Sequence, residues 1–175
     1  MSRPRVGLTV GDPAGIGPEI ARAAREDASL REELELVVVG PAALRIDDVE
    51  WVTTDGPAEW ELGGAQRTCG LAALAALRGG VEHATSGEVA ALVTGPDSKE
   101  ALHLAGEKVE GQTELLARWA GVTRYEMIGI AGDLRVMLLT RHMPLRTALE
   151  RITQEGVVGH LELFTEALRD LGIAA

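Results

Sequence analysis

The sequence predicts an α/β protein in which a mostly parallel β-sheet carries helices on both faces. Short continuous runs of Val, Leu and Ile alternate with stretches of helical periodicity, as in proteins whose strands are buried beneath crossover helices. Gly- and Pro-rich turns directly follow several of the apolar runs. Strands are predicted over residues 6–10, 36–39, 89–94, 127–131 and 134–140, and helices over 18–28, 65–83, 113–120 and 153–171.

Details of the pattern refine this prediction. Apolar side chains in the helix predicted over 153–171 recur at spacings of four and three and share one face: Val157, Leu161, Phe164, Leu168 and Leu171. Gly132 and Asp133 suit a hairpin turn between the last two strands, so we expect one antiparallel pair. Residues 53–65 are expected to form a loop. Gly172 suits a helix C-cap and Ile173 the start of another strand, so we expect the protein to continue beyond residue 175.

The amino-acid composition limits the classes of protein to which this chain can belong. The 175 residues suit one domain, or one domain with part of a second, and 46% of them are hydrophobic, which argues against disorder. Aromatic residues make up only 3%, so the core must consist of Leu, Val, Ile and Ala. The net charge of -10 and the absence of basic runs argue against a nucleic-acid partner.

The sole cysteine, Cys69, excludes an internal disulfide and a cysteine-built zinc site, and is typical of a reducing compartment. We expect it to be a small buried residue on a helix. The N-terminal residues enter a strand pattern directly and contain no apolar run long enough for a signal peptide or a membrane span. The sequence therefore predicts a cytoplasmic protein with no membrane partner.

The densest motif is Gly-Asp-Pro-Ala-Gly-Ile-Gly-Pro-Glu at residues 11–19, directly after the first predicted strand. Gly17 is predicted to cap the next helix, with Pro18 at its first position. No Lys-Ser/Thr pair follows, which excludes a P-loop, and the glycine spacing differs from the dinucleotide fingerprint. A structural turn and a ligand-lining loop both remain open, because α/β folds place ligands at the carboxyl ends of strands.

A second motif, Thr-Gly-Pro-Asp-Ser-Lys-Glu at residues 94–100, again leads from a strand into a turn. Ser98 is predicted to cap a helix, which places Lys99 in the first turn. A cation there opposes the helix dipole at a cost of about 0.3–1 kcal/mol. Lys99 is therefore either an anion-binding residue or a solvated surface lysine.

Two shorter motifs follow. At residues 111–114, Gly-Gln-Thr-Glu is predicted to open a helix. Thr113 suits the N-cap and Glu114 the first turn, so a structural role is enough to explain this motif. Thr-Arg-His-Met-Pro-Leu at residues 140–145 places His142 after the last strand. A lone loop histidine is usually only a surface residue, with a metal role as the rarer alternative.

Taken in order, the four motifs resemble the 4-hydroxythreonine-4-phosphate dehydrogenase family of vitamin B6 biosynthesis. The family pattern is GDPAGIGPE, then TGPxxKE, GHTE and TxHxPL. The first motif is complete at residues 11–19, the second stands at 94–100 and the fourth at 140–145. The region of residues 40–88 is shorter than the corresponding region of the family and matches its pattern poorly.

The resemblance implies a two-domain fold like that of isopropylmalate dehydrogenase, usually a homodimer. Residues 1–175 would be its N-terminal α/β portion, with the C-terminal part absent, so the chain is expected to be truncated. The resemblance also implies oxidation of a small hydroxy acid such as 4-phosphohydroxythreonine by NAD or NADP, followed by decarboxylation. The divalent metal of the family, held by three histidines, would be zinc, cobalt, nickel, iron or magnesium.

Residue by residue, the resemblance maps one metal ligand to His142 and substrate binding to Gln112 and Thr113. We add Lys99 and Asp12 as candidate substrate-binding residues, whereas catalytic and cofactor-binding residues are not identified. Gln112 stands where the family has histidine, and an amide cannot carry a proton charge to a phosphate. An altered hydroxy acid, phosphorylated or not, is therefore expected.

Two other hypotheses remain open. The chain is alternatively a non-catalytic truncated relative that binds a small anion or pairs with another subunit. As a structural remnant it would instead expose apolar surface and aggregate. The enzyme hypothesis depends on one structural prediction, that the loops at Asp12, Lys99, Thr113 and His142 converge at the same edge of one sheet.

Overall fold

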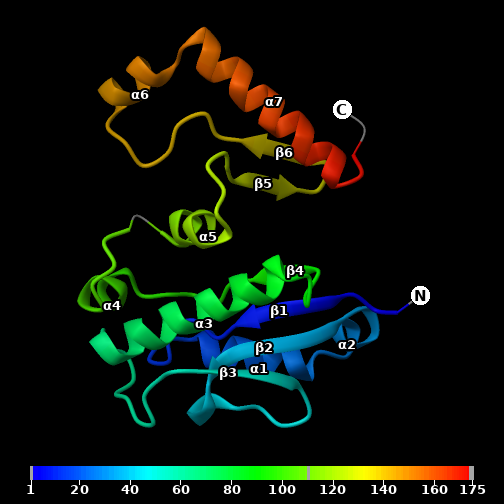
Figure 1. Cartoon of the computed structure of the whole chain (residues 1–175), viewed down its shortest axis with the longest axis vertical. Coiled ribbons are helices and arrows are strands. Elements are labelled where there is room, and N and C mark those ends of the chain that lie inside the picture. The colour runs from blue at the N-terminus through cyan, green and yellow to red at the C-terminus, as the bar shows by residue number, and fades with distance from the viewer. Residues whose placement is uncertain (1, 110, 174–175) are drawn as a thin grey trace. The chain divides into compact units, whose positions relative to one another are not determined.

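The computed structural model of the chain describes residues 2–109 and 111–173. The chain forms two compact units, Met1–Gly121 and Val122–Ala175. The elements of both are labelled in Figure 1. No helix in the described part of the chain is both long enough and apolar enough to cross a bilayer.

The first unit contains a four-stranded, fully parallel sheet in the order β3-β2-β1-β4. The strands are β1 (Arg5–Thr9), β2 (Glu35–Pro41), β3 (Glu50–Thr54) and β4 (Ala91–Val93). This confirms the predicted parallel sheet and the strands predicted over 6–10, 36–39 and 89–94, which correspond to β1, β2 and β4. Strand β3 was not predicted, because its sequence Glu-Trp-Val-Thr-Thr is short and only half-buried at the edge of the sheet.

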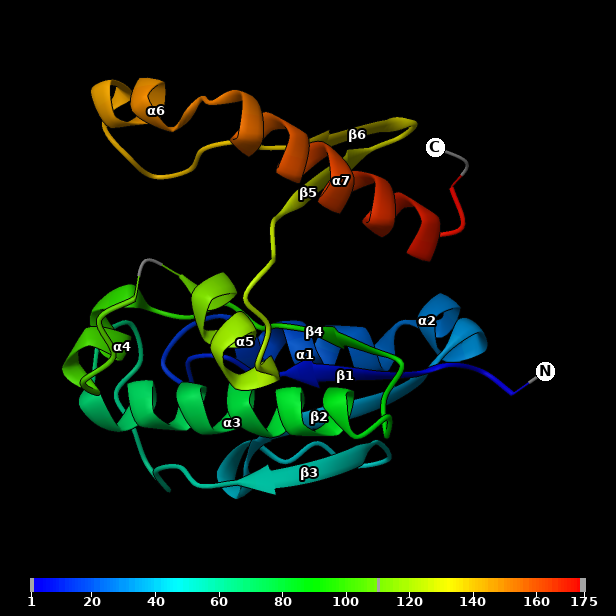
Figure 2. The same cartoon turned by 45° about the horizontal axis from the view of Figure 1, so that its top comes forward.

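Helices cover both faces of this sheet, as predicted (Figure 2). Helix α3 (Arg67–Thr85) packs against all four strands on one face. Helix α1 (Gly17–Glu26) covers the other face, where its Ala21 joins the buried side chains of Leu8, Val10 and Val38. The two faces are separate because side chains alternate along each strand. Short helix α2 (Ala28–Glu33) and a 3-10 turn, Ala42–Leu44, complete the connections between the strands.

Small residues on α3 let the shorter helix α4 (Lys99–Leu104) approach it closely. A Cβ atom built on Gly70 would lie only 2.0 Å from the carbonyl oxygen of Ala101. Cys69 is completely buried on the same helix, as predicted. Helix α5 (Gln112–Ala120) also packs on α3, so α3 positions both helices that follow β4.

Capping follows the predictions only in part. Ser98 caps α4 as predicted, accepting a hydrogen bond from the Ala101 amide. Helix α1 begins at Gly17 with Ile16 as its N-cap, and α5 begins at Gln112 with Gly111 as its N-cap, so Gly17 and Thr113 are not the caps. Thr113 lies one residue inside α5. The extended backbone of Gly111 already supplies the turn into the helix, which leaves Thr113 no capping role.

The second unit consists of a β-hairpin and two helices. Strands β5 (Ile128–Ala131) and β6 (Leu134–Met137) pair antiparallel around a turn in which Gly132 has φ +56°. This confirms the predicted hairpin. Helices α6 (Leu145–Arg151) and α7 (Gln154–Asp170) follow, and α6 was not predicted. Gly172, with φ +72°, follows the end of α7 as predicted for a C-cap glycine.

Burial in the second unit differs from the prediction. The strands predicted over 127–131 and 134–140 were expected to be buried, yet they form a separate two-stranded sheet whose side chains are exposed or half-buried. None of the described residues between 122 and 173 is buried. Leu161 and Leu171, predicted to share one apolar face of α7, are 58% and 55% exposed. A periodic pattern identifies an apolar face, but it does not show what covers that face.

Candidate functional site

The loop after β1 is built by glycines at positions where no side chain fits. Gly11 has φ +70°, and a Cβ atom there would lie 2.3 Å from the carbonyl oxygen of Pro96. A Cβ atom on Gly17 would lie 1.8 Å from the carbonyl oxygen of Val10. These glycines are therefore explained by close backbone packing. The tip of the loop is different, because Ile16 is exposed there.

Backbone and side-chain hydrogen bonds hold this loop against the loop after β4. The amide of Asp12 donates to the carbonyl oxygen of Pro96 at 3.0 Å. The amide of Gly95 donates to the buried hydroxyl of Thr9, also at 3.0 Å. The two loops therefore lie side by side at the carboxyl ends of β1 and β4, the edge where open parallel sheets bind ligands.

Asp12 is 4% exposed and shapes its own loop. One carboxylate oxygen accepts a hydrogen bond from the amide of Ala14 at 2.8 Å, and the carbonyl oxygen of Asp12 accepts another from Gly15. This arrangement accounts for the aspartate structurally. Its predicted role in substrate binding stays a prediction.

Gln112, at the start of α5, reaches back to the loop after β4. Its Nε2 group donates to the carbonyl oxygen of Gly95 at 2.8 Å and to the carboxylate of Asp97 at 2.7 Å. Burial raises the pKa of Asp97 to about 6, against the lowering effect of the Gln112 hydrogen bond and with a further increase from the negative charge of Asp12. Asp97 is thus a half-buried carboxylate that titrates close to neutral pH.

These elements line a cavity of about 440 Å³ within the first unit. The start of α1, the loop after β4 and the first turns of α4 and α5 form its wall, which includes Ile16, Ile20, Thr94, Asp97, Lys99 and Gln112. Both isoleucines are exposed. Among the described residues, the lining of the cavity combines these apolar side chains with the ammonium group of Lys99 and the carboxyl group of Asp97.

The predicted residues fall into three groups. Lys99 and Gln112 both line the cavity, although they come from different helices. The loop that holds Asp12 and the first turn of α5, which holds Thr113, both meet the loop after β4, but neither side chain lines the cavity. His142 belongs to the second unit, so its convergence with the other loops stays a prediction.

Sequence reasoning missed Asp97. It occupies a variable position of the second motif, where nothing marks it as functional. A usable signal was its place two residues before Lys99 and directly after a Gly-Pro turn, which brings a carboxylate to the carboxyl edge of β4.

His142 lies in the loop between β6 and α6, is exposed, and has a left-handed backbone with φ +47°. Such a conformation is uncommon for a residue other than glycine and is worth notice at a functional site. Its neighbour Arg141 pairs with Glu126 at 3.0 Å, and Glu126 also lies 3.4 Å from His160 of α7. Through Glu126, these contacts join the loop to α7 within the second unit.

A larger cavity of about 660 Å³ also lies in the second unit. Thr140 and Met143 of the fourth motif line it, together with Glu126 and His160, but His142 does not. Size therefore does not select the candidate site, since the larger cavity contains none of the predicted substrate-binding residues.

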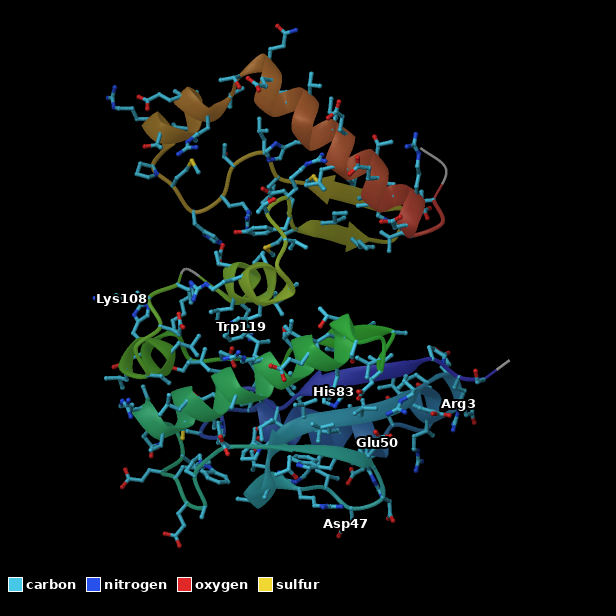
Figure 3. The ribbon with its side chains drawn as sticks, in the orientation of Figure 1. Arg3, Asp47, Glu50, His83, Lys108 and Trp119 are labelled. Carbon is cyan, nitrogen blue, oxygen red and sulfur yellow. The ribbon has the colours of Figure 1, made fainter. Side chains whose placement is uncertain are left out.

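A complete metal site is not present in the part of the chain that the structure describes. No three His, Cys, Asp or Glu side chains among those residues are placed to hold an ion together. A protein site for a tightly held metal commonly needs three or four ligands, so His142 can supply only one of them. Of the other three histidines, His83 and His160 each contact a backbone carbonyl oxygen one helical turn earlier, and Figure 3 labels His83 on α3.

Comparison with known proteins identifies the family. Residues 16–175 match the family model described as pyridoxal phosphate biosynthetic protein PdxA. The 4-hydroxythreonine-4-phosphate dehydrogenase of a Nostoc species is 32% identical, over 99% of this chain and 56% of its own length.

Solved structures of dehydrogenases also resemble this chain. A 4-hydroxythreonine-4-phosphate dehydrogenase from Burkholderia phymatum has a TM-score of 0.85 at 29% identity, covering 99% of this chain and 60% of that one. A terephthalate 1,2-cis-dihydrodiol dehydrogenase from Burkholderia xenovorans has a TM-score of 0.72 at 28% identity, covering 99% and 59%.

The chain thus spans somewhat more than half the length of these relatives. The fold and the first, second and fourth motifs agree with the family match, which extends over most of the chain. This protein therefore belongs to the PdxA family of pyridoxal phosphate biosynthetic proteins, whose relatives are named dehydrogenases.

Proposed function

We propose that residues 1–175 form the N-terminal α/β portion of a two-domain dehydrogenase that oxidises a hydroxyl group of a small hydroxy acid. One observation supports this most directly: Lys99 and Gln112, from two separate motifs, line one cavity at the carboxyl edge of a parallel sheet. The substrates that the relatives' names suggest are 4-hydroxythreonine 4-phosphate and a cyclic dihydrodiol. Both carry an oxidisable secondary hydroxyl.

Each cavity residue has a proposed task. The ammonium group of Lys99 binds the acidic group of the substrate, and Gln112 orients a polar group of the same molecule. Ile16 and Ile20 exclude water from the apolar side of the bound molecule. Together they would hold the hydroxy acid in one orientation for hydride removal.

NAD or NADP is the proposed hydride acceptor, and loss of carbon dioxide from the β-keto acid is the proposed second step. The described residues show no cradle for a dinucleotide, because the glycines after β1 pack against backbone atoms. They also do not complete a metal site, so no step is assigned to a metal. His142 is proposed as one ligand of a divalent ion, and a cytoplasmic homodimer as the working form.

The test is nicotinamide reduction by the product of the complete gene, offered 4-hydroxythreonine 4-phosphate, 4-hydroxythreonine and a cis-dihydrodiol. We expect reduction with at least one compound, and a loss of at least about tenfold in kcat/KM for Lys99→Ala. In His142→Ala we expect reduced metal content by elemental analysis. The 175-residue chain alone is expected to show no turnover, because His142 cannot form a metal site by itself.

The outcomes separate the hypotheses. Failure to reduce either nicotinamide with any of the three compounds would overturn the dehydrogenase proposal. Binding of a small anion without turnover by the complete gene product would support the non-catalytic alternative instead.

A further inference from the structure

The hydrogen bonds of Gln112 determine which way its amide faces. The Gly95 carbonyl oxygen can only accept, so the group that approaches it at 2.8 Å must be the NH₂ end of Gln112. The same nitrogen lies 2.7 Å from the carboxylate of Asp97. Both N–H groups of the amide are therefore used within the protein.

The amide oxygen is left for a ligand. Among the described residues, Oε1 of Gln112 accepts no hydrogen bond, and Gln112 lines the cavity. Asp97, its partner, lines the same cavity and carries a carboxylate. A ligand group that approaches this wall thus meets an amide oxygen and a carboxylate, both of which are hydrogen-bond acceptors.

We infer that Asp97 and Gln112 form an acceptor-only pair that selects a hydroxyl group of the substrate and rejects a phosphate group at this wall. The inference rests on the proposed dehydrogenase function and narrows its substrate class to a hydroxy acid without phosphate at that position. A hydroxyl can donate to the amide oxygen. The oxygens of a phosphate dianion would face two acceptors and a like charge.

The charges around the cavity also favour a hydroxyl group over a phosphate group at Gln112. The buried carboxyl group of Asp12 lies close enough to Asp97 for its charge to raise the pKa of Asp97. Lys99 is the cation of the cavity wall and comes from the first turn of a different helix, α4. A hydroxy acid can therefore place its carboxylate at Lys99 and a hydroxyl at Gln112. An anionic group at Gln112 would instead face the carboxyl group of Asp97.

The pairing itself can be tested without a ligand. In ¹⁵N-labelled chain, both side-chain amide protons of Gln112 should exchange with solvent more slowly than those of an exposed glutamine such as Gln154. The variant Asp97→Ala should speed exchange of at least one of them. Fast exchange of both protons in the unmodified protein would overturn the inference.

The preference for a hydroxyl group over a phosphate group is tested by titrating the same labelled chain with 4-hydroxythreonine and with 4-hydroxythreonine 4-phosphate. The side-chain amide signals of Gln112 report the affinity for each compound. We expect the unphosphorylated compound to bind at least about tenfold more tightly, since a mispaired polar wall discriminates by at least that factor. Gln112→His should reduce or reverse the ratio, because imidazolium donates to phosphate. Asp97→Asn should also reduce it, because the change removes the charge and replaces an acceptor-only carboxylate with an amide that can donate to phosphate.

Glu33→Gln provides the matched control, since it makes an acid-to-amide change on exposed α2 and should leave both affinities within about twofold. Equal or tighter binding of the phosphate ester to the unmodified chain would overturn the inference and leave the dehydrogenase proposal intact. So would an unchanged ratio in Gln112→His. If neither compound affects Gln112 at millimolar concentration, the inference fails together with the use of this cavity for substrate.

Discussion

At the residue scale, Asp97 shows how a neighbouring side chain and burial together change the chemistry of a carboxyl group. Its pKa is about 6 in the folded protein against an ordinary 3.8, chiefly because burial disfavours the charged form. The hydrogen bond from Gln112 opposes this shift without cancelling it. The folded chain therefore binds this proton more tightly than the unfolded chain does.

This linkage predicts a pH-dependent gain in stability for Asp97→Asn. Above pH 6 the buried carboxylate opposes folding, whereas below about pH 4 the carboxyl is neutral in both states and behaves like the amide. We expect the variant to be more stable by about 1 kcal/mol at pH 7.5, allowing for partial solvent exposure. The advantage should decline between pH 6 and 4 in urea unfolding. A constant difference across this range would contradict the assigned pKa.

Gly11 illustrates a second residue-scale constraint, because it combines a left-handed backbone with a close approach to Pro96. We expect Gly11→Ala to lower the free energy of unfolding by about 3 kcal/mol. Gly63→Ala is the control, since Gly63 has φ +79° but no atom within 4 Å of a new Cβ. It should cost only about 1 kcal/mol. Equal losses would show that backbone strain, and not the contact with Pro96, explains Gly11.

At the element scale, helix α3 places the two helices that carry Lys99 and Gln112. Its packing depends on small residues, and two glycines of the same helix face very different surroundings. A Cβ atom at Gly70 would collide with backbone of α4, whereas one at Gly79 would lie 3.3 Å from a methyl group of Val39. Side chains can adjust to such a contact more readily than a packed backbone can.

This difference predicts that alanine is tolerated at Gly79 but not at Gly70, although both glycines lie on α3. Gly70→Ala should destabilise the protein by about 2 kcal/mol or more, because α4 must move. In Gly79→Ala the change should stay within about 1 kcal/mol, since helix propensity favours alanine and offsets the tight contact. Urea unfolding of both variants measures this. If Gly79→Ala proved the more damaging, the packing of α4 on α3 would be wrong.

At the scale of the whole molecule, the two units differ in how much they bury. The first unit buries apolar side chains beneath α1 on one face of its sheet and along α3 on the other, whereas no described residue of the second unit is buried. Apolar side chains such as Leu145 and Leu149 are 75% and 63% exposed there. Local stability depends on buried apolar contacts, so the second unit should open more easily.

The rates of native-state amide hydrogen exchange should therefore differ between the residues before and after about residue 121. We expect the slowest amides in β1, β2 and α3, and exchange at least about a hundredfold faster across β5, β6 and α7. Peptides from α5 provide the internal reference, because α5 packs on α3. Comparable protection in both units would contradict the difference in burial.

The sequence by itself determined the parallel sheet of the first unit, the hairpin, the cap at Ser98 and the family. These are recorded in apolar periodicity, in turn residues and in motifs of four to nine residues, all of which are local in the chain. It missed β3 and α6, and misplaced the starts of α1 and α5, because short or half-buried elements carry little periodic signal. It also took the strands of the second unit to be buried.

Only the tertiary structure decided which residues share the cavity. Lys99 and Gln112 line it, whereas Asp12 supports its own loop and Thr113 lies beside the wall. Asp97 became a candidate only once Gln112, fifteen residues away, was seen to donate to it. A hydrogen bond between separate elements depends on the path of the backbone between them, and no local pattern in the sequence encodes that path.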